Sequence, residues 1–468
     1  MNAKSQKTSE KSRAMFPVLL GCSFVASFGE SMMSIALPEV ADTFSLTLSM
    51  ANWLVTGYLV VAATTVTLAA FLLKRLGLRV VFFIGIGALA IGSGLAMLAS
   101  DFPTLFACRL IQAVCTGLFF PLVTGTIMAT SRKDRLGLHL AMNSGIIAFG
   151  LAICPVVSGL LLTYVGWRAM FAVPLALAAV LLPLGFYVLR DAEKGERARI
   201  DVLSAALSLV GLGALMYGLS EFTHDVVPSV IALGIAAVAI ALFVWRQLAS
   251  RSPLLNLRPL GHPRFAVGLL MVMVGTMTSF SLSVLLPLYF EGAIGHTAFF
   301  AGLLLLGPVL VNAVCSLLGG RLFDRRGVWP MLPMGLGLVL AGLAGVFVSA
   351  EHMRVDLVVA ASAVSYAGLG FVVTPAKTAA LDHLPAELYA HGASINSTFV
   401  QIASALGPSL FVGVLSADVL RETAAGLSKA HAYALGFSHT LTIAIGISLV
   451  GLIIALFYAH ALRKKPGR

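Results

Sequence analysis

Long apolar stretches separated by short charged segments fill nearly the whole chain. Thirteen stretches contain no charged residue and are each 19 to 33 residues long, from 43–73 near the start to 430–462 near the end. A fourteenth, at 14–38, is interrupted only by Glu30. About 20 apolar residues carry a helix across a bilayer, and none of these stretches reaches twice that length. The pattern therefore predicts fourteen membrane-spanning helices, because a backbone in lipid must satisfy its own hydrogen bonds.

The composition supports this membrane assignment. The 468-residue chain is 59% hydrophobic and only 11% charged, whereas a soluble domain is about 25% charged. A soluble chain this apolar could not cover its own surface, so lipid must be its solvent. The cysteines lie in apolar stretches without CxxC spacing, which favours buried inert thiols over redox or metal chemistry. They are Cys22, Cys108, Cys115, Cys154 and Cys315.

Lysine and arginine are distributed unevenly over the predicted loops. Of the 31 basic residues, 25 fall on the side that also carries both termini. Basic residues favour the cytoplasmic side of a membrane protein, so we expect a multi-pass protein of the cell (inner) membrane with both termini in the cytoplasm. This asymmetry also explains the net charge of +11 without a nucleic-acid partner. The other basic residues are Arg168, Arg354, Arg421 and Lys429 in opposite loops, and Arg109 and Lys377 within spans.

The chain repeats itself at an offset of about 250 residues. Five features recur in the same order: Leu37-Pro38 as Leu286-Pro287, Arg75-x-Gly77 as Arg325-x-Gly327, Pro121 as Pro375, Pro155 as Pro408 and Gly159 as Gly413. Transporters are commonly built from two such halves, with the substrate site where the halves meet. The repeat therefore indicates alternating access.

The repeat also predicts the domain organisation, a 6+2+6 arrangement of helices. The predicted parts are a cytoplasmic tail at 1–15, a six-helix bundle at 16–190, a two-helix insert at 201–247, a second six-helix bundle at 265–460 and a tail at 461–468. Because the insert falls outside the repeat, we do not expect it to line the substrate path. The longest loop on the side opposite the termini is expected at 416–436.

Several motifs resemble those of one transporter family. They are Glu30-Ser31-Met32-Met33-Ser34-Ile35-Ala36-Leu37-Pro38, Trp53-Leu54-Val55-Thr56-Gly57-Tyr58, Arg109-Leu110-Ile111-Gln112, Cys154-Pro155-Val156-Val157-Ser158-Gly159 and Gly320-Arg321-Leu322-Phe323-Asp324-Arg325-Arg326-Gly327. Over essentially its whole length the chain is similar to the fourteen-helix drug:proton antiporters of the major facilitator superfamily, of the QacA/EmrB type and most like the LmrB-like branch. It departs at Gly29, where many members have Asp, and at Lys74, where the family has Asp.

The resemblance implies the major facilitator superfamily fold and transport driven by the proton gradient, without a cofactor. It also implies a set of conformational-gate residues: Pro155 and Gly159 in the fifth predicted helix, and Gly320, Asp324, Arg325 and Gly327 in a loop motif. A carboxylate at Asp324 would complement a helix N-terminus and latch the cytoplasmic side. Lys74, at the equivalent place in the first half, has the wrong sign for this role.

Glu30 and Arg109 are the candidates for proton coupling. An ionisable group inside a span is costly and usually functional, and Glu30 lies about 12 Å from the outer end of its helix by the helical rise. Arg109 is expected at a similar depth, where it could stabilise the ionised carboxylate. The alternatives are a structural hydrogen bond for Glu30 and an outward-snorkelling side chain for Arg109.

Other polar and aromatic side chains in the spans are candidates for the substrate cavity. They are Trp53, Tyr58, Asn143, Tyr289, Asn312, Asn396 and Gln401. Each amide is as well suited to joining neighbouring helices as to binding a substrate. Lys377 is open to two interpretations: it reaches the cytoplasmic boundary, or it contacts the substrate.

These observations favour a proton-coupled multidrug exporter for small amphipathic or cationic compounds, acting as a monomer in lipid and conferring antibiotic resistance. The alternative is an exporter or flippase of an endogenous metabolite or lipid. A membrane sensor or scaffold is disfavoured by the buried Glu30 and by the lack of a cytoplasmic domain. An enzyme is disfavoured because the sequence shows no nucleophile–base pair, and it has no ATP-binding or metalloprotease motif.

Overall fold

The computed structural model describes residues 3–131, 136–189, 201–222, 225–250, 253–326, 328–382 and 384–463. Within these ranges the secondary structure is helical, and no strand is present. Thirteen helical segments are long and apolar enough to cross a membrane, and Met15–Ser31 is a shorter apolar helical segment. The prediction of an all-α membrane protein is confirmed, with Met15–Ser31 in the place of the first of the fourteen predicted spans.

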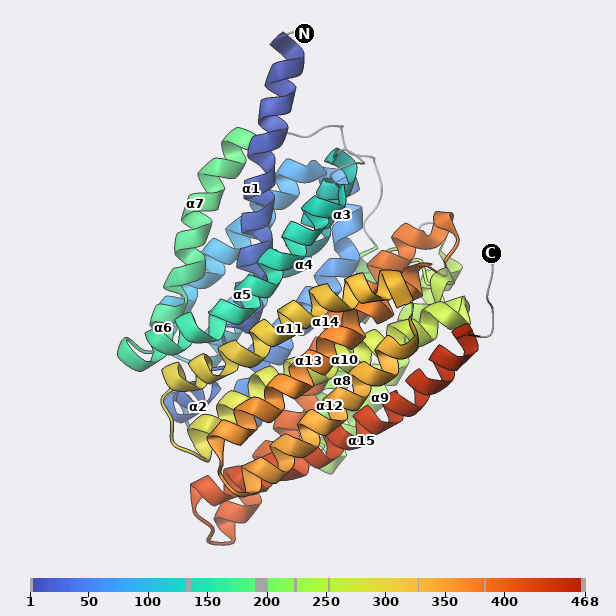
Figure 1. Cartoon of the computed structure of the whole chain (residues 1–468). Coiled ribbons are helices and arrows are strands. Elements are labelled where there is room, and N and C mark those ends of the chain that lie inside the picture. The colour runs from blue at the N-terminus through green and yellow to red at the C-terminus, as the bar shows by residue number, and fades with distance from the viewer. Residues whose placement is uncertain are drawn as a thin grey trace.

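The helices follow the order of the predicted spans (Figure 1). They are α1 (Ala3–Ser31), α2 (Leu37–Phe44), α3 (Leu48–Met97), α4 (Phe102–Thr130), α5 (Leu136–Tyr164), α6 (Trp167–Met170), α7 (Ala172–Val188), α8 (Val202–Ser220), α9 (Val226–Ala249), the 3-10 helix η1 (Arg258–Gly261), α10 (Pro263–Gly292), α11 (Ala298–Arg326), α12 (Val328–Glu351), α13 (Val355–Asp382), α14 (Ala386–Ala424) and α15 (Lys429–Arg463). Helix α3 holds two spans, because Gly77 breaks it with a φ of 82° that favours glycine.

The first span differs from its prediction at both ends. Helix α1 begins at Ala3, inside the predicted tail, and ends at Ser31, followed by a turn before α2. The expectation of one helix over 14–38 is therefore wrong at its end. Pro38 lies in the first turn of α2, and proline is tolerated there because the N–H it lacks would have no partner inside the helix. A new helix thus starts where the first was expected to continue.

The predicted long loop at 416–436 is also wrong. Helix α14 continues to Ala424 and α15 begins at Lys429. The charged residues in this stretch satisfy one another along the helix, since the Arg421 guanidinium lies 3.0 Å from Asp418, three residues earlier. Charge therefore marks the end of the apolar span without ending the helix.

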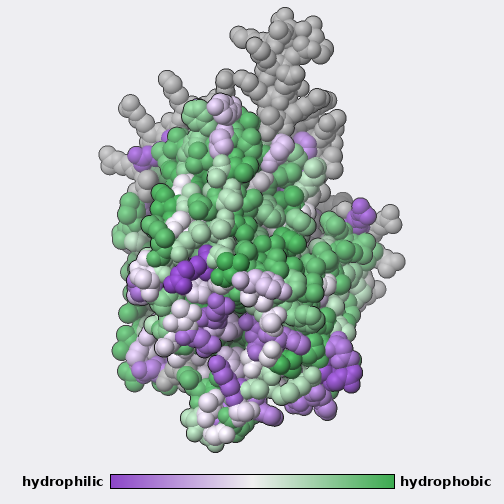
Figure 2. All heavy atoms as spheres, turned by 90° about the vertical axis from the view of Figure 1, so that its left-hand side faces the viewer, coloured by the Kyte–Doolittle hydropathy of each residue, from purple (hydrophilic) through white to green (hydrophobic). Residues whose placement is uncertain are grey.

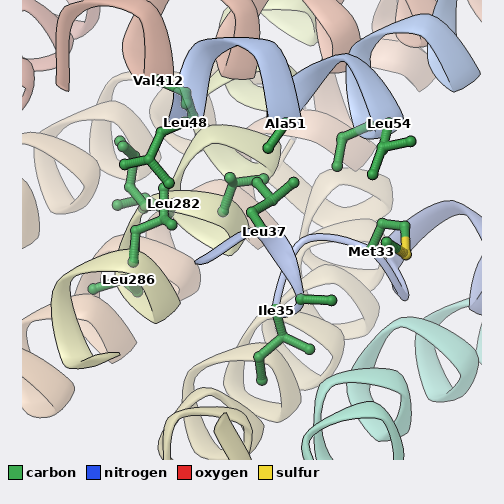
Figure 3. Packing of buried hydrophobic residues seen from close by; sticks show 14 of the residues in the cluster. Met33, Ile35, Leu37, Leu48, Ala51, Leu54, Leu282, Leu286 and Val412 are labelled. Carbon is green, nitrogen blue, oxygen red and sulfur yellow. The ribbon is translucent and has the colours of Figure 1, made fainter. Parts of the chain in front are cut away.

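The apolar core is shared on one side of the molecule and divided on the other. We call the side where α1 begins and α15 ends the terminal side, and the opposite side the far side. On the far side one core includes Leu37, Leu48 and Leu54 of the first half with Leu282 and Val412 of the second (Figure 3). Toward the terminal side, each half has clusters of its own. The two halves thus meet on the far side and diverge toward the terminal side, as their ribbons do in Figure 1.

Short polar contacts join α3 to α14 across this boundary, which we call the seam. The Asn52 Nδ2 donates to the Pro408 carbonyl over 3.2 Å, and the hydroxyls of Thr56 and Ser409 lie 3.1 Å apart. All four residues lie in the far-side parts of their helices. Small polar groups suit a helix pair in lipid, because they allow close approach and still exchange hydrogen bonds.

Glycines join α5 to α11 at the seam. A side chain at Gly159 would collide with the backbone of Ala298, and one at Gly302 would collide with the carbonyl of Pro155. The Phe299 amide N–H donates to the Thr163 hydroxyl over 3.1 Å. The helices therefore touch backbone to backbone, which is possible only with small residues at the crossing.

The insert contacts both halves, which the sequence did not predict. The Ser49 hydroxyl of α3 lies 2.8 Å from the Ser220 hydroxyl at the end of α8 and donates to Glu221 over 2.5 Å. The Ser49 amide donates to the Ser416 hydroxyl of α14 over 3.3 Å. On the α14 side, a side chain at Gly413 would collide with the Ser220 carbonyl. Helix α8 is thus part of the far-side seam.

An ion pair holds the two insert helices together on the terminal side. Asp201 caps α8 by accepting from the Ser204 amide over 3.1 Å, and the Arg246 side chain of α9 donates to the same carboxylate over 2.9 Å. These hydrogen bonds favour the charged form and lower the pKa of Asp201 to about 2. The domain boundaries of the sequence analysis stay predictions.

The outer surface has the character expected of a protein in lipid. Apolar side chains cover much of the face shown in Figure 2, and polar ones gather toward its lower end, the far side. Large exposed apolar residues such as Phe186, Tyr187 and Trp245 would be unfavourable in water.

The glycine crossing generates a prediction about the closed far side. Gly302→Leu should drive the halves apart there, because the Pro155 backbone cannot yield to a side chain. Overpacking of this kind shifts the balance between closed and open forms by about tenfold or more. Oxidative cross-linking of Thr163→Cys with Phe299→Cys measures closure, and its yield should fall.

Gly307→Leu is the matched control on the same helix, because a side chain at Gly307 meets no atom within 4 Å. Its cross-linking yield should equal that of the protein without either leucine. Equal yields from the two leucine variants would contradict the assignment of this crossing.

Candidate functional site

Glu30 lies at the boundary between the halves and is 5% exposed. It occupies the last turn of α1, just before the chain turns toward α2. Gln401 of α14, in the other half, is 3% exposed and lies close to this carboxyl group. Among the described ion pairs, none includes Glu30. A buried carboxyl group thus lies near an amide of the opposite half and in no described ion pair.

Arg109 is completely buried in α4 and fastens the end of α1. Its Nη2 donates to the Gly29 carbonyl over 3.1 Å, and its Nε donates to the Leu54 carbonyl of α3 over 3.3 Å. Helix α1 ends two residues after Gly29, so this carbonyl has lost the helical partner it would otherwise have. A cation at the C-terminal end of a helix also favours the helix dipole.

The remaining contacts of Arg109 complete a buried network. Its Nη1 donates to the Gln112 side chain over 2.8 Å, and Gln112 in turn donates to the Ser93 hydroxyl over 2.8 Å. The guanidinium carbon lies 4.2 Å from the centre of the Tyr58 ring. The expected direct pairing of Arg109 with Glu30 is absent from these described contacts: Arg109 binds the backbone of the neighbouring residue.

Two further side chains bind carbonyl groups in the last turns of α1. Thr116 of α4 donates to the Ala26 carbonyl over 3.2 Å and is hydrogen-bonded to the Tyr58 hydroxyl, and the Cys154 thiol of α5 lies 3.2 Å from the Phe28 carbonyl. The position of Glu30 is therefore set by α3, α4 and α5 together.

Most of the predicted cavity residues join helices within one half. Asn143 accepts from the Ser23 hydroxyl over 2.6 Å, Asn312 donates to the Tyr366 carbonyl over 2.9 Å, and Tyr289 donates to the Ala350 carbonyl over 3.1 Å. Tyr58 is 1% exposed and belongs to the Arg109 network. The structure thus favours the helix-joining alternative for these four side chains.

The other three cavity candidates lie differently. The ring of Trp53 packs 6.2 Å from that of Tyr217 on α8 and 6.3 Å from that of Phe106 on α4, so it belongs to the contact with the insert. Asn396 is 2% exposed and its side-chain oxygen and nitrogen have no described partner, and the Gln401 oxygen also has none. Helix α14 therefore carries unused hydrogen-bonding capacity.

The predicted gate residues fall into two groups. Pro155 and Gly159 form the backbone contact with α11 described above, and Gly320 packs against Thr374 of α13. The side chains of Asp324 and Arg325 lie outside the described residues, as does Gly327. The backbone of Asp324 lies in the last turn of α11, so its expected place at a helix N-terminus is wrong. The latch assigned to its side chain stays a prediction. Lys377 is exposed within the last two turns of α13.

Sequence reasoning missed the polar residues of the seam, above all Ser49, Asn52 and Thr56. They lie at regular spacing within an apolar stretch of α3 and face α14. The spacing of three to four residues places them on one face of a helix, which is the signal that could have found them. Glu39 was also missed: it accepts from the Trp167 amide over 3.3 Å, and burial raises its pKa.

The Arg109 network generates a prediction about stability. Arg109→Lys should lower the unfolding temperature in detergent, because an ammonium cannot reproduce the fork that binds three groups. Each buried acceptor left without a donor costs about 1–3 kcal/mol. Thiol labelling during heating measures unfolding, since four of the five cysteines are buried. Arg354→Lys is the control at an exposed ion pair, and equal unfolding temperatures for the two variants would contradict this role.

Comparisons with known proteins assign the family. The model of the Major Facilitator Superfamily matches residues 19–408. The lincomycin resistance protein LmrB of Bacillus subtilis is 30% identical over 453 residues, covering 94% of each chain. The multidrug resistance protein Stp of Mycobacterium tuberculosis is 26% identical over 82% of this chain and 72% of its own. The riboflavin transporter RibZ of Clostridioides difficile is 23% identical over 93% of this chain and 95% of its own.

A solved structure confirms the fold independently. The D-xylose–proton symporter superposes with a TM-score of 0.67 over 95% of this chain and 96% of its own, at 16% identity. Transporters, and no enzymes, make up the relatives named above. The chain belongs to the Major Facilitator Superfamily, within its LmrB-like branch.

Proposed function

We propose that this protein is a proton-coupled exporter of small amphipathic or cationic compounds that works by alternating access. The observation that carries this proposal is Glu30, a carboxyl group buried between two half-molecules that takes part in none of the described ion pairs. A carboxylate buried without a cation costs several kcal/mol, more than one hydrogen bond returns. The group therefore needs either a proton or another positive charge.

This requirement provides a route to exchange. When the site is open to the far side, Glu30 takes up a proton, and the neutral group is buried as the far side closes. On the terminal side, a cationic or polar substrate competes with the proton for the same carboxyl group. Release of the proton then accompanies loading of the substrate, as an antiporter requires.

We propose that the terminal side is the cytoplasmic side. The support is the concentration of 25 of 31 basic residues in the loops and tails of that side. The conformation described here, joined on the far side, is then the one that receives substrate from the cytoplasm. Protons moving inward down their gradient drive export, so no other energy source is needed.

The names of the relatives support drugs as substrates. LmrB is named for lincomycin resistance and Stp for multidrug resistance. The alternative substrate class is an endogenous metabolite or lipid, and RibZ, named as a riboflavin transporter, supports it. Screening lincomycin, cationic dyes and riboflavin in everted vesicles separates the two classes.

Glu30→Gln tests the proposed coupling. The variant should insert and fold, because an amide has nearly the shape of a protonated carboxyl group and also donates and accepts hydrogen bonds, but it cannot release a proton. In everted vesicles carrying an imposed pH gradient, it should show at least about a tenfold loss of substrate-dependent proton movement, measured with a pH-sensitive dye. Asp356→Asn, at an exposed ion pair, serves as the control and should transport normally. Near-normal proton-driven transport by Glu30→Gln would refute the assignment.

A further inference from the structure

Lys377 is an ionisable side chain within a span that the proposed proton coupling does not use. It lies within the last two turns of α13, the helix that runs from the far side to the terminal side. Its side chain is exposed, although its neighbours Pro375 and Ala376 are buried. Among the described side chains, none forms a hydrogen bond or an ion pair with Lys377. A charged group in a span is costly and usually functional, so the space into which Lys377 points decides its role.

The contacts of α13 show the direction of this side chain. Val373 packs against Gly275 of α10, and Thr374 packs against Gly320 of α11. Residues three and four places apart lie on the same face of a helix. Lys377 follows Thr374 by three residues and Val373 by four, so it points between α10 and α11.

The lipid-facing side of α13 lies elsewhere. Leu357 is 46% exposed and Val364 is 39% exposed, and these large apolar side chains mark the face that meets the membrane. By the helical repeat, Lys377 points about 140° away from Val364. Ala380 and Leu381, one turn further toward the terminal side on the face of Lys377, are buried in an apolar cluster. Lys377 therefore lies deeper than these buried residues and opens into the space between the halves.

The side chain is also directed away from the terminal end of its helix. Side chains on a helix tilt toward its N-terminus, which for α13 is the far side. A lysine that only reached the membrane boundary would have to reverse this tilt. Charges interact more strongly in an enclosed space between apolar helices than they do in water. The ammonium of Lys377 therefore attracts anionic groups that enter from the terminal side and repels cationic ones.

We propose that Lys377 determines which charge a transported compound carries, by binding an anionic group such as a carboxylate, sulfonate or phosphate of an amphipathic substrate. A zwitterion suits both ionisable groups of the path: its amine competes with the proton at Glu30, and its anionic group binds Lys377. A purely cationic amphiphile is repelled at Lys377 and is a poorer substrate. The inference rests on the proposed function only in taking the space between the halves as the substrate path.

Two dyes that differ in charge and little else test this specificity. One is a rhodamine with a free carboxylate, which is a zwitterion at neutral pH, and the other is its methyl ester, a cation of nearly the same size. Binding of each dye to the purified protein in nanodiscs of neutral lipid is measured by fluorescence polarisation, without a pH gradient. The unsubstituted protein should bind the carboxylate dye about tenfold more tightly, the effect of one hydrogen bond to a charged group.

Variants at position 377 separate charge from shape. Lys377→Gln should weaken binding of the carboxylate dye about tenfold and leave the ester unchanged. Lys377→Glu should reverse the preference, because it now attracts the cation. Lys377→Arg keeps the positive charge and should keep the preference for the carboxylate dye. Arg258→Gln is the matched control, since it removes an exposed charge of η1 on the terminal side, and it should bind both dyes as the unsubstituted protein does.

A thiol at position 377 tests the placement without any dye. The background is Cys315→Ala, because Cys315 is the one cysteine that is not fully buried. A hydrophilic thiol reagent should label Lys377→Cys in nanodiscs, since water fills the space between the halves. Val364→Cys, on the lipid-facing side of the same helix, is the control and should stay unlabelled. A Lys377→Cys variant that also stays unlabelled would overturn the inference.

The anion bound by Lys377 has two sources, a soluble compound or a lipid headgroup, and the lipid composition separates them. An anionic phospholipid added to the nanodiscs competes with the carboxylate dye if the headgroup phosphate binds Lys377, and Lys377→Gln should abolish this competition. Without competition, the bound anion belongs to a soluble compound. Either result agrees with recognition of an anion.

Equal weakening of both dyes by Lys377→Gln would overturn the inference, because it would indicate a structural role for the lysine. So would a variant that changes neither dye, or an unsubstituted protein that binds the ester as tightly as the carboxylate dye. These results would leave the proposed function standing if Glu30→Gln abolishes proton-driven transport. Charge-selective binding together with normal transport by Glu30→Gln would instead refute the proposed function and leave the role of Lys377 intact.

Discussion

The proposed activity depends on one carboxyl group, that of Glu30, which is buried between the two half-molecules and forms none of the described ion pairs. Removing a charge from water costs several kcal/mol, and in this protein the buried guanidinium of Arg109 is already committed to the Gly29 and Leu54 carbonyls. The free energy of Glu30 therefore depends on its proton. In the cycle we propose, this proton is exchanged, whereas a carboxylate paired permanently with Arg109 would hold its charge. The absence of that pairing from the described contacts is what favours Glu30 as the exchanging group.

The two halves contribute unequally to this site. In the first half, side chains of α4 and α5 bind the carbonyls of Ala26, Phe28 and Gly29, so the end of α1 is fixed. Helix α14 of the second half instead leaves polar atoms of Asn396 and Gln401 without described partners. Unsatisfied buried groups cost free energy, and they persist where a ligand or another conformation satisfies them. The first half thus holds its carboxyl group rigidly, and the second half carries the polar groups that are free to bind a ligand.

The sequence was sufficient for the features that depend on one helix at a time. The presence of most spans, the burial of Glu30 and the close helix approach at Pro155 and Gly159 follow from local composition. The expected depth of Glu30 was wrong, because α1 ends at Ser31 and not near Pro38. The features it could not provide depend on two helices meeting. The sequence of a single span cannot show that Arg109 binds a backbone carbonyl of α1 or that Asn143 joins α1 to α5. Nor can it show that the helix continues through the charged residues at 418–421. Position in the repeat predicted that the insert does not line the substrate path, but it says nothing about which surface α8 covers.

The contacts of α8 indicate with which half the insert moves. Against α14 the packing leaves no room for a side chain at Gly413, and interfaces packed this closely do not slide gradually. Against α3 the contact combines the packing of the Trp53 ring on Tyr217 with hydrogen bonds from Ser49 to Ser220 and Glu221. Such bonds contribute only about 0.5–1.5 kcal/mol net, because water replaces them when they break. A seam that opens on the far side should therefore part between α8 and α3, where Ser49 becomes hydrated. The insert would then move with the second half as one rigid body. The boundary between the moving parts would run along α3, the helix that contacts Pro408 and Ser409 of α14.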